Sequence, residues 1–374
     1  MPDRELYIGL MSGTSADSID AVLADLSGEQ HRLLATLSCD IDDLKSDIHE
    51  LATPGSNEIS CMGQLDRELG VRFANAVNTL LHRECIDSSQ VIAVGSHGQT
   101  IRHLPPGHGD MHPFTLQIGD PNTIAHLTGI TTVADFRRRD IALGGQGAPL
   151  TPLFHRAAFE KPGTPRVIIN IGGIANITLL YGDDVSSPLG YDTGPGNGLM
   201  DSWILQCLGK AYDDNGQWAS EGRVIQPLLE QFLKTPYLLK KPPKSTGREL
   251  FNPEWLTQQL ASFGNSADPA DLQATLLEFT AQTISTSIRK SHGPIAEAYL
   301  CGGGAYNGAL VSRISALLAP IQVSTTEALG ILPGWVEAMA FAWLAQQTLA
   351  GKPGNEPTVT GASAASVLGA IHPA

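Results

Sequence analysis

The sequence has 374 residues, of which 42% are hydrophobic, so it is long enough for two domains with buried cores. Only 17% of the residues are charged, whereas 39 glycines and 24 prolines indicate many tight turns. The chain carries 24 Lys and Arg against 38 Asp and Glu, a net charge of −14. This balance excludes a broadly cationic surface for nucleic acid or anionic lipid, although a local anion site remains compatible with it.

Targeting and redox signals are weak in this sequence. Residues 1–5 lack the basic-then-apolar order of a signal peptide, and no stretch of about 20 residues is apolar enough to span a bilayer. The five cysteines are odd in number and form no Cys-x-x-Cys pair, which argues against a disulfide framework and a structural zinc site. We therefore expect a cytoplasmic protein with buried, free thiols and no membrane partner.

Two similar hairpins are predicted far apart in the chain. An apolar run at residues 6–11, a Gly/Ser/Thr turn and a second apolar run at 19–26 predict the first hairpin. The pattern returns at residues 166–171 and 174–180, around Gly172-Gly173. The spacing of about 160 residues exceeds the roughly 20–50 of a short repeat, so duplication of a whole domain is the better interpretation.

Helices and strands alternate along the rest of the sequence. Helical spacing of apolar residues covers 60–83, 272–288, 309–318 and 336–349, and buried strands are predicted at 91–95 and 298–301. The pattern predicts an α/β fold with a first domain at 1–140, to which 357–374 returns, and a second domain at 141–356. The basic, proline-containing segment 234–248 is expected to be an exposed insertion or flap.

Three glycine turns are candidates for anion binding. The turn at Ser12 to Ser15 follows a strand, and glycine there allows a ligand to approach the main chain. Alone it is better interpreted as an ordinary hairpin turn, but Gly172-Gly173 occupies the equivalent place in the second half and favours a phosphate site. A third turn, Gly302 to Gly304, precedes a helix that starts near Asn307, and helix N-termini suit nucleotide phosphates. P-loop and Rossmann motifs are absent from the sequence.

Asp192 is the strongest candidate for a catalytic group. It lies in the segment Gly190 to Asn197, where Gly and Pro frame a carboxylate on a rigid loop, as suits a general base. The alternative is an Asp that caps the following helix. Asn197 fits that cap better, which favours a catalytic Asp192.

Other polar groups follow strand-like runs, where α/β proteins place ligand contacts. His97 is interpreted equally well as a turn histidine bound to backbone or as a site residue. At least two of Arg137 to Arg139 are expected to be solvated, whereas one could clamp a carboxylate or phosphate. Glu337 is a lone acid in an apolar helix, either at its solvated edge or inside a site.

Taken in order, these motifs resemble those of the anhydro-N-acetylmuramic acid kinases, which belong to the sugar kinase, heat-shock ATPase and actin superfamily. The resemblance covers essentially the whole chain. It implies two related RNase H-like domains of the actin/sugar kinase type with an interdomain cleft. The motifs that carry it are residues 9–15 with Asp17 and Asp20, 98–100, 135–137, 144–150, 170–176, 192–197 and 302–307.

The resemblance also implies roles for individual residues, with ATP and Mg²⁺ as cofactors. Asp192 would be the base, and Asp17 would contribute to the magnesium site. Substrate contacts would come from Gln99, Thr100, Arg137 and Glu337. Nucleotide contacts would come from Ser12, Gly13, Thr14, Ser15, Ala16, Asp17 and Ser18, from Gly172 and Gly173, and from Gly302, Gly303, Gly304 and Asn307.

The activity implied is the ATP-dependent opening of 1,6-anhydro-N-acetylmuramic acid to N-acetylmuramic acid 6-phosphate, a step of peptidoglycan recycling. Asp192 would activate the water that attacks C1 while the freed O6 takes the phosphoryl group. An ordinary sugar or acyl kinase and an actin- or chaperone-like ATPase switch remain alternatives. A glycosidase that uses Asp192 and Glu337 would leave the glycine turns without a purpose. A homodimer stays open.

Overall fold

The computed structural model describes residues 4–13, 16–28, 30–107, 112–183, 186–247, 250–291 and 293–374. The chain divides into two compact units. Unit 1 comprises Met1–Phe159 and Trp335–Ala374, and unit 2 comprises Glu160–Gly334. Both boundaries differ from the predicted ones, because unit 1 extends beyond residue 140 and the chain returns to it well before residue 357.

Unit 1 is built on a six-stranded sheet with the order β13-β7-β4-β1-β2-β3. The first three strands pair antiparallel, and β4 and β7 then continue in parallel beside β1. A separate two-stranded sheet contains β5 and β6. The strands are β1 Leu6–Ser12, β2 Ser18–Asp25, β3 Arg32–Asp40, β4 Val91–Ser96, β5 Gln99–Leu104, β6 Phe114–Ile118, β7 Thr132–Ala134 and β13 Ala370–His372.

Two helices cover the main sheet of unit 1. Ile8 and Leu10 of β1 share a buried apolar cluster with Leu69 and Phe73 of α2, whereas α12 packs on β1 and β4. Because strand side chains alternate between faces, α2 and α12 lie on opposite faces. The helices are α1 Asp42–Ala52, α2 Glu58–Glu84, α3 Pro121–Thr128, α4 Arg138–Ala142, α5 Pro152–Phe159, α12 Val336–Leu349 and α13 Pro357–Thr360, with a 3₁₀ turn at Ser88–Gln90.

The contact between α12 and the sheet requires glycine in two strands. A Cβ at Gly9 would lie 1.8 Å from the carbonyl oxygen of Ala338, and one at Gly95 would lie 2.0 Å from that of Phe341. The α12 backbone therefore rests directly on the strands. This packing assigns the chain from Trp335 onward to unit 1 and explains why the predicted second boundary is wrong.

Helix α5 explains why the first domain boundary lies after residue 159 and not at residue 140. Phe154 of α5 is fully buried, and its ring centroid lies 6.2 Å from that of Trp343 in α12. Phe159 packs edge-on against Phe154 at 6.1 Å. The aromatic packing holds residues up to Phe159 in unit 1.

Unit 2 repeats the strand topology of unit 1. Its five-stranded sheet has the order β10-β9-β8-β11-β12, with three antiparallel strands followed by two parallel ones. The strands are β8 Arg166–Ile171, β9 Ile174–Leu180, β10 Leu189–Pro195, β11 Glu297–Cys301 and β12 Gln322–Thr325. The order matches β3-β2-β1-β4-β7 strand for strand. This confirms the prediction of an α/β fold with two related domains.

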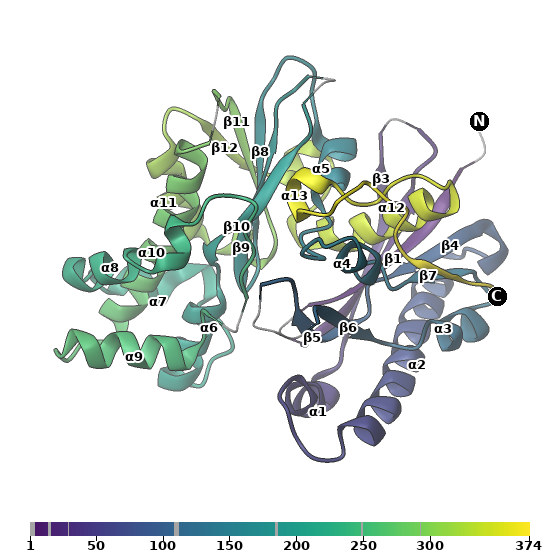
Figure 1. The fold of residues 1–374 in the computed structure, drawn as a ribbon, viewed down its shortest axis with the longest axis horizontal. Coiled ribbons are helices and arrows are strands. Elements are labelled where there is room, and N and C mark those ends of the chain that lie inside the picture. Colours follow the sequence, from purple (N-terminus) through teal and green to yellow (C-terminus); the bar gives the residue numbers. More distant parts are fainter. Residues whose placement is uncertain are drawn as a thin grey trace. The chain divides into compact units, whose positions relative to one another are not determined.

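Helices gather on one side of the unit 2 sheet (Figure 1). The long helix α10 contacts β9 and β10 and is almost entirely buried. The helices are α6 Gly198–Leu208, α7 Gln217–Glu221, α8 Gln226–Leu233, α9 Pro253–Phe263, α10 Pro269–Arg289 and α11 Gly308–Leu318. Shorter 3₁₀ turns are η2 Asp214–Gly216, η3 Pro236–Leu239, η4 Gly303–Tyr306, η5 Thr326–Leu329 and η6 Pro333–Trp335, the last of which reaches the unit boundary.

The basic segment 234–248 is only partly the exposed flap that the sequence predicts. Lys240 to Pro243 are exposed, but Tyr237 in η3 is buried in the apolar core of unit 2. Its ring packs edge-on against Phe251 at 6.0 Å. An aromatic anchor therefore fixes the start of this segment.

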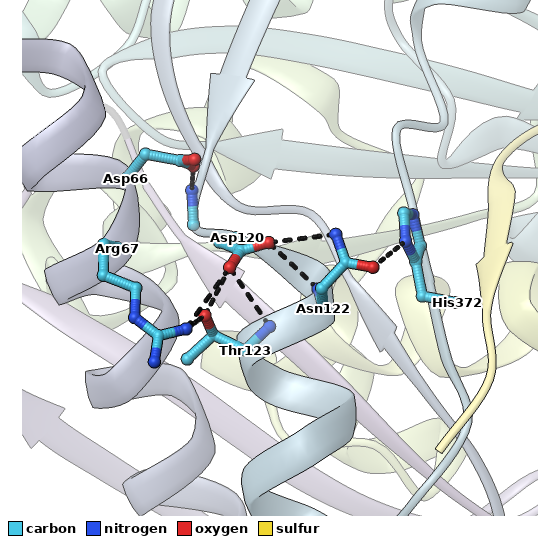
Figure 2. A network of polar contacts seen from close by, with 7 residues as sticks. Asp66, Arg67, Asp120, Asn122, Thr123 and His372 are labelled. Atoms are coloured by element: carbon cyan, nitrogen blue, oxygen red, sulfur yellow. Dashed lines mark hydrogen bonds and ion pairs between the residues drawn. The ribbon is translucent and has the colours of Figure 1, made fainter.

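A polar network in unit 1 joins α2 and α3 to the C-terminal strand (Figure 2). Asp120 caps α3 by accepting hydrogen bonds from the backbone of Asn122 and Thr123, and it forms an ion pair with Arg67. The Asn122 side chain in turn contacts His372 of β13 at 3.2 Å. Burial acts to raise the pKa of the Asp120 carboxyl, but its hydrogen bonds from Thr123 and Asn122 together lower it. The charged carboxylate thus suits this helix N-terminus.

In the described ranges no helix is long and apolar enough to cross a membrane. The five cysteines are free, as predicted, but the expectation that they are buried is wrong for all except Cys301.

The glycine contacts predict a clear stability difference. Gly95→Ala should destabilise unit 1 by about 1–3 kcal/mol, because the added methyl group forces the α12 backbone off the sheet. Gly63→Ala is the matched control: it lies in α2 with open space around a Cβ, and helix propensity should stabilise it by roughly 0.5–1 kcal/mol. Urea unfolding followed by circular dichroism measures both. Equal stability of the two variants would contradict the close approach of α12.

Candidate active site

The turn between β1 and β2 is closed by Ser12. Its hydroxyl lies 2.7 Å from Gln99 Oε1 and 3.1 Å from the carbonyl oxygen of Ser18, and both Ser12 and Gln99 are buried. Gln99 Nε2 donates to the carbonyl oxygen of Thr100. The structure thus brings the predicted nucleotide residues Ser12 and Ser18 together with the predicted substrate residues Gln99 and Thr100.

In the rest of this turn the backbone at Ala16 is fixed, whereas the space beside Gly13 is open. Ala16 is buried in the left-handed region at φ 54°, and its N–H donates to the carbonyl oxygen of Gly13. A Cβ at Gly13 would meet no atom within 4 Å, and the φ of Gly13 is not positive. Thr14 and Ser15, both predicted to contact nucleotide, lie outside the described residues.

Asp17, the predicted magnesium ligand, is exposed and forms an ion pair with Lys45. In the part of the chain that the structure describes, no three or more His, Cys, Asp or Glu side chains gather as a metal site. Mg²⁺ usually takes one or two carboxylates together with substrate phosphates and water. These residues fit a magnesium ion that binds together with the nucleotide phosphates. They do not fit a site in which protein ligands alone hold the metal.

Arg137 is held by partners that sequence reasoning did not pair with it. Its Nε donates to His97 Nε2 at 3.0 Å, and its Nη1 donates to the carbonyl oxygen of Gly147 at 2.8 Å. Because Nε2 accepts, the ring proton is assigned to Nδ1, which lies 2.8 Å from the carbonyl oxygen of Gly98. The interpretation of His97 as a turn histidine bound to backbone is confirmed, whereas its alternative role in a site stays a prediction.

His97 is suited to this role because it stays neutral. It is 5% exposed, and its ring packs on Phe341 of α12 at a centroid distance of 4.7 Å. Burial, reinforced by the Arg137 charge, holds the pKa of His97 well below its ordinary value. Glu337 lies one helical turn before Phe341, is half-buried, and so shares the helix face that meets His97.

A buried carboxylate fixes the loop that carries Gly147. Asp140 is fully buried and accepts hydrogen bonds of 2.7 Å from the Gly147 N–H, from Asn355 Nδ2 and from the Thr360 hydroxyl. Asn355 and Thr360 follow α12 in the C-terminal segment. No local sequence pattern indicates this link between distant segments.

Asp192 lies within β10, not on the rigid loop that the sequence predicts, and is held from the segment after η3. It is 8% exposed, and its Oδ2 accepts a hydrogen bond of 2.9 Å from the Thr246 N–H. Its own N–H donates to the carbonyl oxygen of Lys244 at 3.3 Å, and its carbonyl oxygen accepts from the Tyr237 hydroxyl at 2.9 Å. The strand pairing shifts register between Asp192 and Gly194, which turns the chain here.

The helix cap expected from Asn197 is not formed. Asn197 occupies the N-cap position of α6, but its side chain makes no capping hydrogen bond and instead approaches the carbonyl oxygen of Ile171 at 3.4 Å. The cap expected at Asn197, which favoured a catalytic Asp192, therefore gives that role no support. The carboxylate of Asp192 accepts from the Thr246 N–H, and its catalytic role stays a prediction.

The glycine turns of unit 2 lie against one another. The carbonyl oxygen of Gly172 accepts from the Asn197 N–H, and that of Gly173 accepts from Gly196 and Gly198. A Cβ at Gly304 would meet the side chains of Ile171 and Asn197 within 3.0 Å. The second phosphate turn and the third glycine turn thus share one corner of unit 2.

These glycines differ in what requires them. Gly302 has φ 77°, and a Cβ there would lie 2.5 Å from Asn170 Oδ1, so packing alone demands glycine. Gly173 is exposed with nothing within 4 Å, and Gly303 is nearly as open. Asn307 caps α11 by accepting from the Leu310 N–H. The predicted helix start near Asn307 is confirmed, while its predicted nucleotide contact stays a prediction.

Comparison with known proteins identifies the family. A family model described as anhydro-N-acetylmuramic acid kinase matches residues 5–374. The chain belongs to the anhydro-N-acetylmuramic acid kinase family. The anhydro-N-acetylmuramic acid kinase of Coxiella burnetii (strain Dugway 5J108-111) is 52% identical over 370 residues, which cover 99% of this chain and 98% of that protein. The same-named protein of Shewanella sp. (strain ANA-3) is 53% identical over 368 residues, 98% of each chain.

Membership in this family makes the protein a carbohydrate kinase and confirms the resemblance drawn from the motifs. Among solved structures, the activator of the 2-hydroxyisocaproyl-CoA dehydratase from Clostridium difficile with bound ADPNP aligns with a TM-score of 0.45 and 12% identity. That alignment covers 90% of this chain and 92% of the other.

The Asp140 contacts predict a stability effect in the kinase. Asp140→Ala leaves three buried donors without their acceptor and should lower the free energy of unfolding by about 2–5 kcal/mol. Asp43→Ala is the control, because it removes an ion pair with Arg72 in which the Asp43 side chain is 57% exposed, worth less than about 1 kcal/mol. Thermal and urea unfolding compare the two. Similar losses would show that Asp140 does not carry the loop.

Proposed function

We propose that this family member transfers the γ-phosphoryl group of ATP to O6 of 1,6-anhydro-N-acetylmuramic acid while water opens the anhydro bridge. The product is N-acetylmuramic acid 6-phosphate. The match of the whole chain to the family model carries the proposal. We further propose that the reaction runs in the cytoplasm, where ATP is available, on sugars released by cell-wall turnover.

The open glycines support nucleotide binding at the two hairpin turns. Gly13 after β1 and Gly173 after β8 occupy equivalent places in the two repeats, and neither positive φ nor internal packing requires glycine at either position. A ligand that approaches the main chain supplies that requirement. We propose that phosphate groups of ATP accept hydrogen bonds from N–H groups of these turns.

Asp192 is the proposed general base. Water gives a proton to its carboxylate and attacks C1, the C1–O6 bond breaks, and O6 attacks the γ-phosphorus as ADP leaves. The Thr246 N–H holds one carboxylate oxygen, which fixes the direction in which the other faces. Mg²⁺, when it binds with ATP, neutralises charge on the β- and γ-phosphates.

Arg137 is the proposed partner of the lactyl carboxylate of the sugar. A guanidinium matches a carboxylate in charge and in planar geometry. Its contacts with His97 and Gly147 fix the guanidinium plane before substrate arrives. Because the Arg137 side chain is already ordered, less conformational entropy is lost when the sugar binds.

Asp192→Asn tests the coupled reaction. The amide keeps the shape but does not accept the proton, so bridge opening and phosphorylation should fall together by about 10²–10⁴-fold, with ADP affinity retained. Phosphorus NMR of the wild-type product from ATP, Mg²⁺ and the anhydro sugar tests the function itself, and chelation of the metal should stop turnover. In ¹⁸O-labelled water the label should enter at C1 and be absent from the transferred phosphoryl group.

Label in the phosphate, or an Asp192→Asn variant of near wild-type rate, would favour an ordinary hydroxyl kinase or an ATPase instead. ATP turnover that does not depend on the sugar would identify the ATPase switch. Release of the opened sugar without ATP would identify the glycosidase.

Arg137→Ala should raise KM for the sugar far more than KM for ATP. Loss of a charge-assisted contact costs about 1.5–3 kcal/mol, or roughly ten- to more than a hundredfold. Arg139→Ala, which removes an exposed arginine of the same segment, is the matched control and should leave both KM values nearly unchanged. Steady-state kinetics with each substrate varied in turn measures the difference. Equal changes in both KM values would assign Arg137 to the phosphates.

A further inference from the structure

The segment Lys240 to Gly247, here called the strap, touches Asp192 on two sides. The Lys244 carbonyl oxygen accepts from the Asp192 N–H, and the Thr246 N–H donates to Asp192 Oδ2. Tyr237, which precedes the strap, donates its hydroxyl proton to the Asp192 carbonyl oxygen. The main chain of Asp192 and its carboxylate are therefore both held from a single neighbouring segment.

The Lys244 side chain lies over two aromatic rings close to the main chain of Asp192. Its Nζ is 4.7 Å from the ring centroid of Tyr237 and 5.7 Å from that of Tyr191, the residue before Asp192. Cation–π contact of this kind orients an ammonium group without a hydrogen bond to a carboxylate. The rings thus fix where the positive charge stands.

Charged and titratable groups around the ammonium come from several elements. Burial lowers the pKa of Lys244, the Asp192 charge acts to raise it, and Lys290 and Lys240 lower it further. The Lys240 ammonium also lies over the Tyr237 ring, at 5.9 Å from its centroid. Burial raises the pKa of Tyr191 to about 12, so its hydroxyl, bonded to the Ser287 carbonyl oxygen, stays neutral. Lys244 and Asp192 are the opposite charges of this group.

We propose that Lys244 is a positioning residue of the reaction: with its ammonium seated on Tyr237 and Tyr191 it keeps Asp192 ionised, while the strap backbone orients the carboxylate. The inference rests on the proposed function of Asp192 as the base. A nearby positive charge favours the ionised carboxylate, the form that accepts a proton from water. The Thr246 N–H orients the carboxylate by binding Asp192 Oδ2.

Lys244→Met tests the charge. The unbranched apolar side chain keeps packing over the rings and leaves the strap backbone in place. The acid limb of the kcat profile should move upward by about 1 pH unit, with KM for ATP unchanged. Lys244→Arg should restore the wild-type profile, because it retains the charge over the rings. Lys241→Met, in the exposed part of the strap, is the matched control and should leave the profile unchanged.

Thr246→Pro tests the orientation, because proline removes the N–H that donates to Asp192 Oδ2. It should lower kcat at least tenfold with ADP affinity retained. Circular dichroism and thermal unfolding verify that each variant is folded. If Thr246→Pro is not folded, the Lys244 pair decides the proposal.

The experiments distinguish a failure of the proposed function from a failure of the inference about Lys244. A wild-type protein that makes no sugar phosphate would overturn the proposed function. An active wild-type protein whose Lys244→Met variant keeps the same acid limb would overturn only the inference about Lys244. A Lys244→Met variant that loses ADP affinity would assign the ammonium to the nucleotide and overturn it as well.

Discussion

The close approach of α12 to β1 and β4 is the contact on which unit 1 depends. Gly9 and Gly95 leave the room that the backbone carbonyls of Ala338 and Phe341 occupy. The same packing carries Phe341 to the ring of His97 and leads the chain on to the residues that bind Asp140. A contact of backbone against backbone thus determines where the groups around Arg137 lie.

What the sequence predicts well is local. The hairpin repeats and the helices at 272–288 and 336–349 follow from patterns within about ten residues. Asp192 does not, because it was expected on a loop and lies inside β10. The domain boundaries were wrong because α12 reaches its strands across more than 240 residues of chain. No local pattern distinguishes a glycine required by such a contact from one required by a turn or a ligand.

The partners of the candidate site residues could not be predicted from local sequence patterns either, because they lie far away in the chain. His97 stands 40 residues before Arg137, and Thr246 stands 54 residues after Asp192. The cap expected at Asn197 is not formed, and its side-chain amide is instead turned to donate to the Ile171 carbonyl oxygen, which only folding brings near. One signal was present: the lysines of segment 234–248 lie close in sequence to Tyr237, and long lysine side chains can pack on an aromatic ring while their charges stay in water.

The described partners of Arg137 and Asp192 share a physical property. Arg137 donates to a neutral imidazole and to a backbone carbonyl, and Asp192 accepts from a backbone N–H. Neutral dipoles fix the direction of an ionised group but leave its net charge in place. A direct pair with an opposite charge would instead offset the field that must act on a substrate carboxylate or on water. In this arrangement Lys244, seated on aromatic rings, can favour the charged form of the base while the backbone sets its orientation.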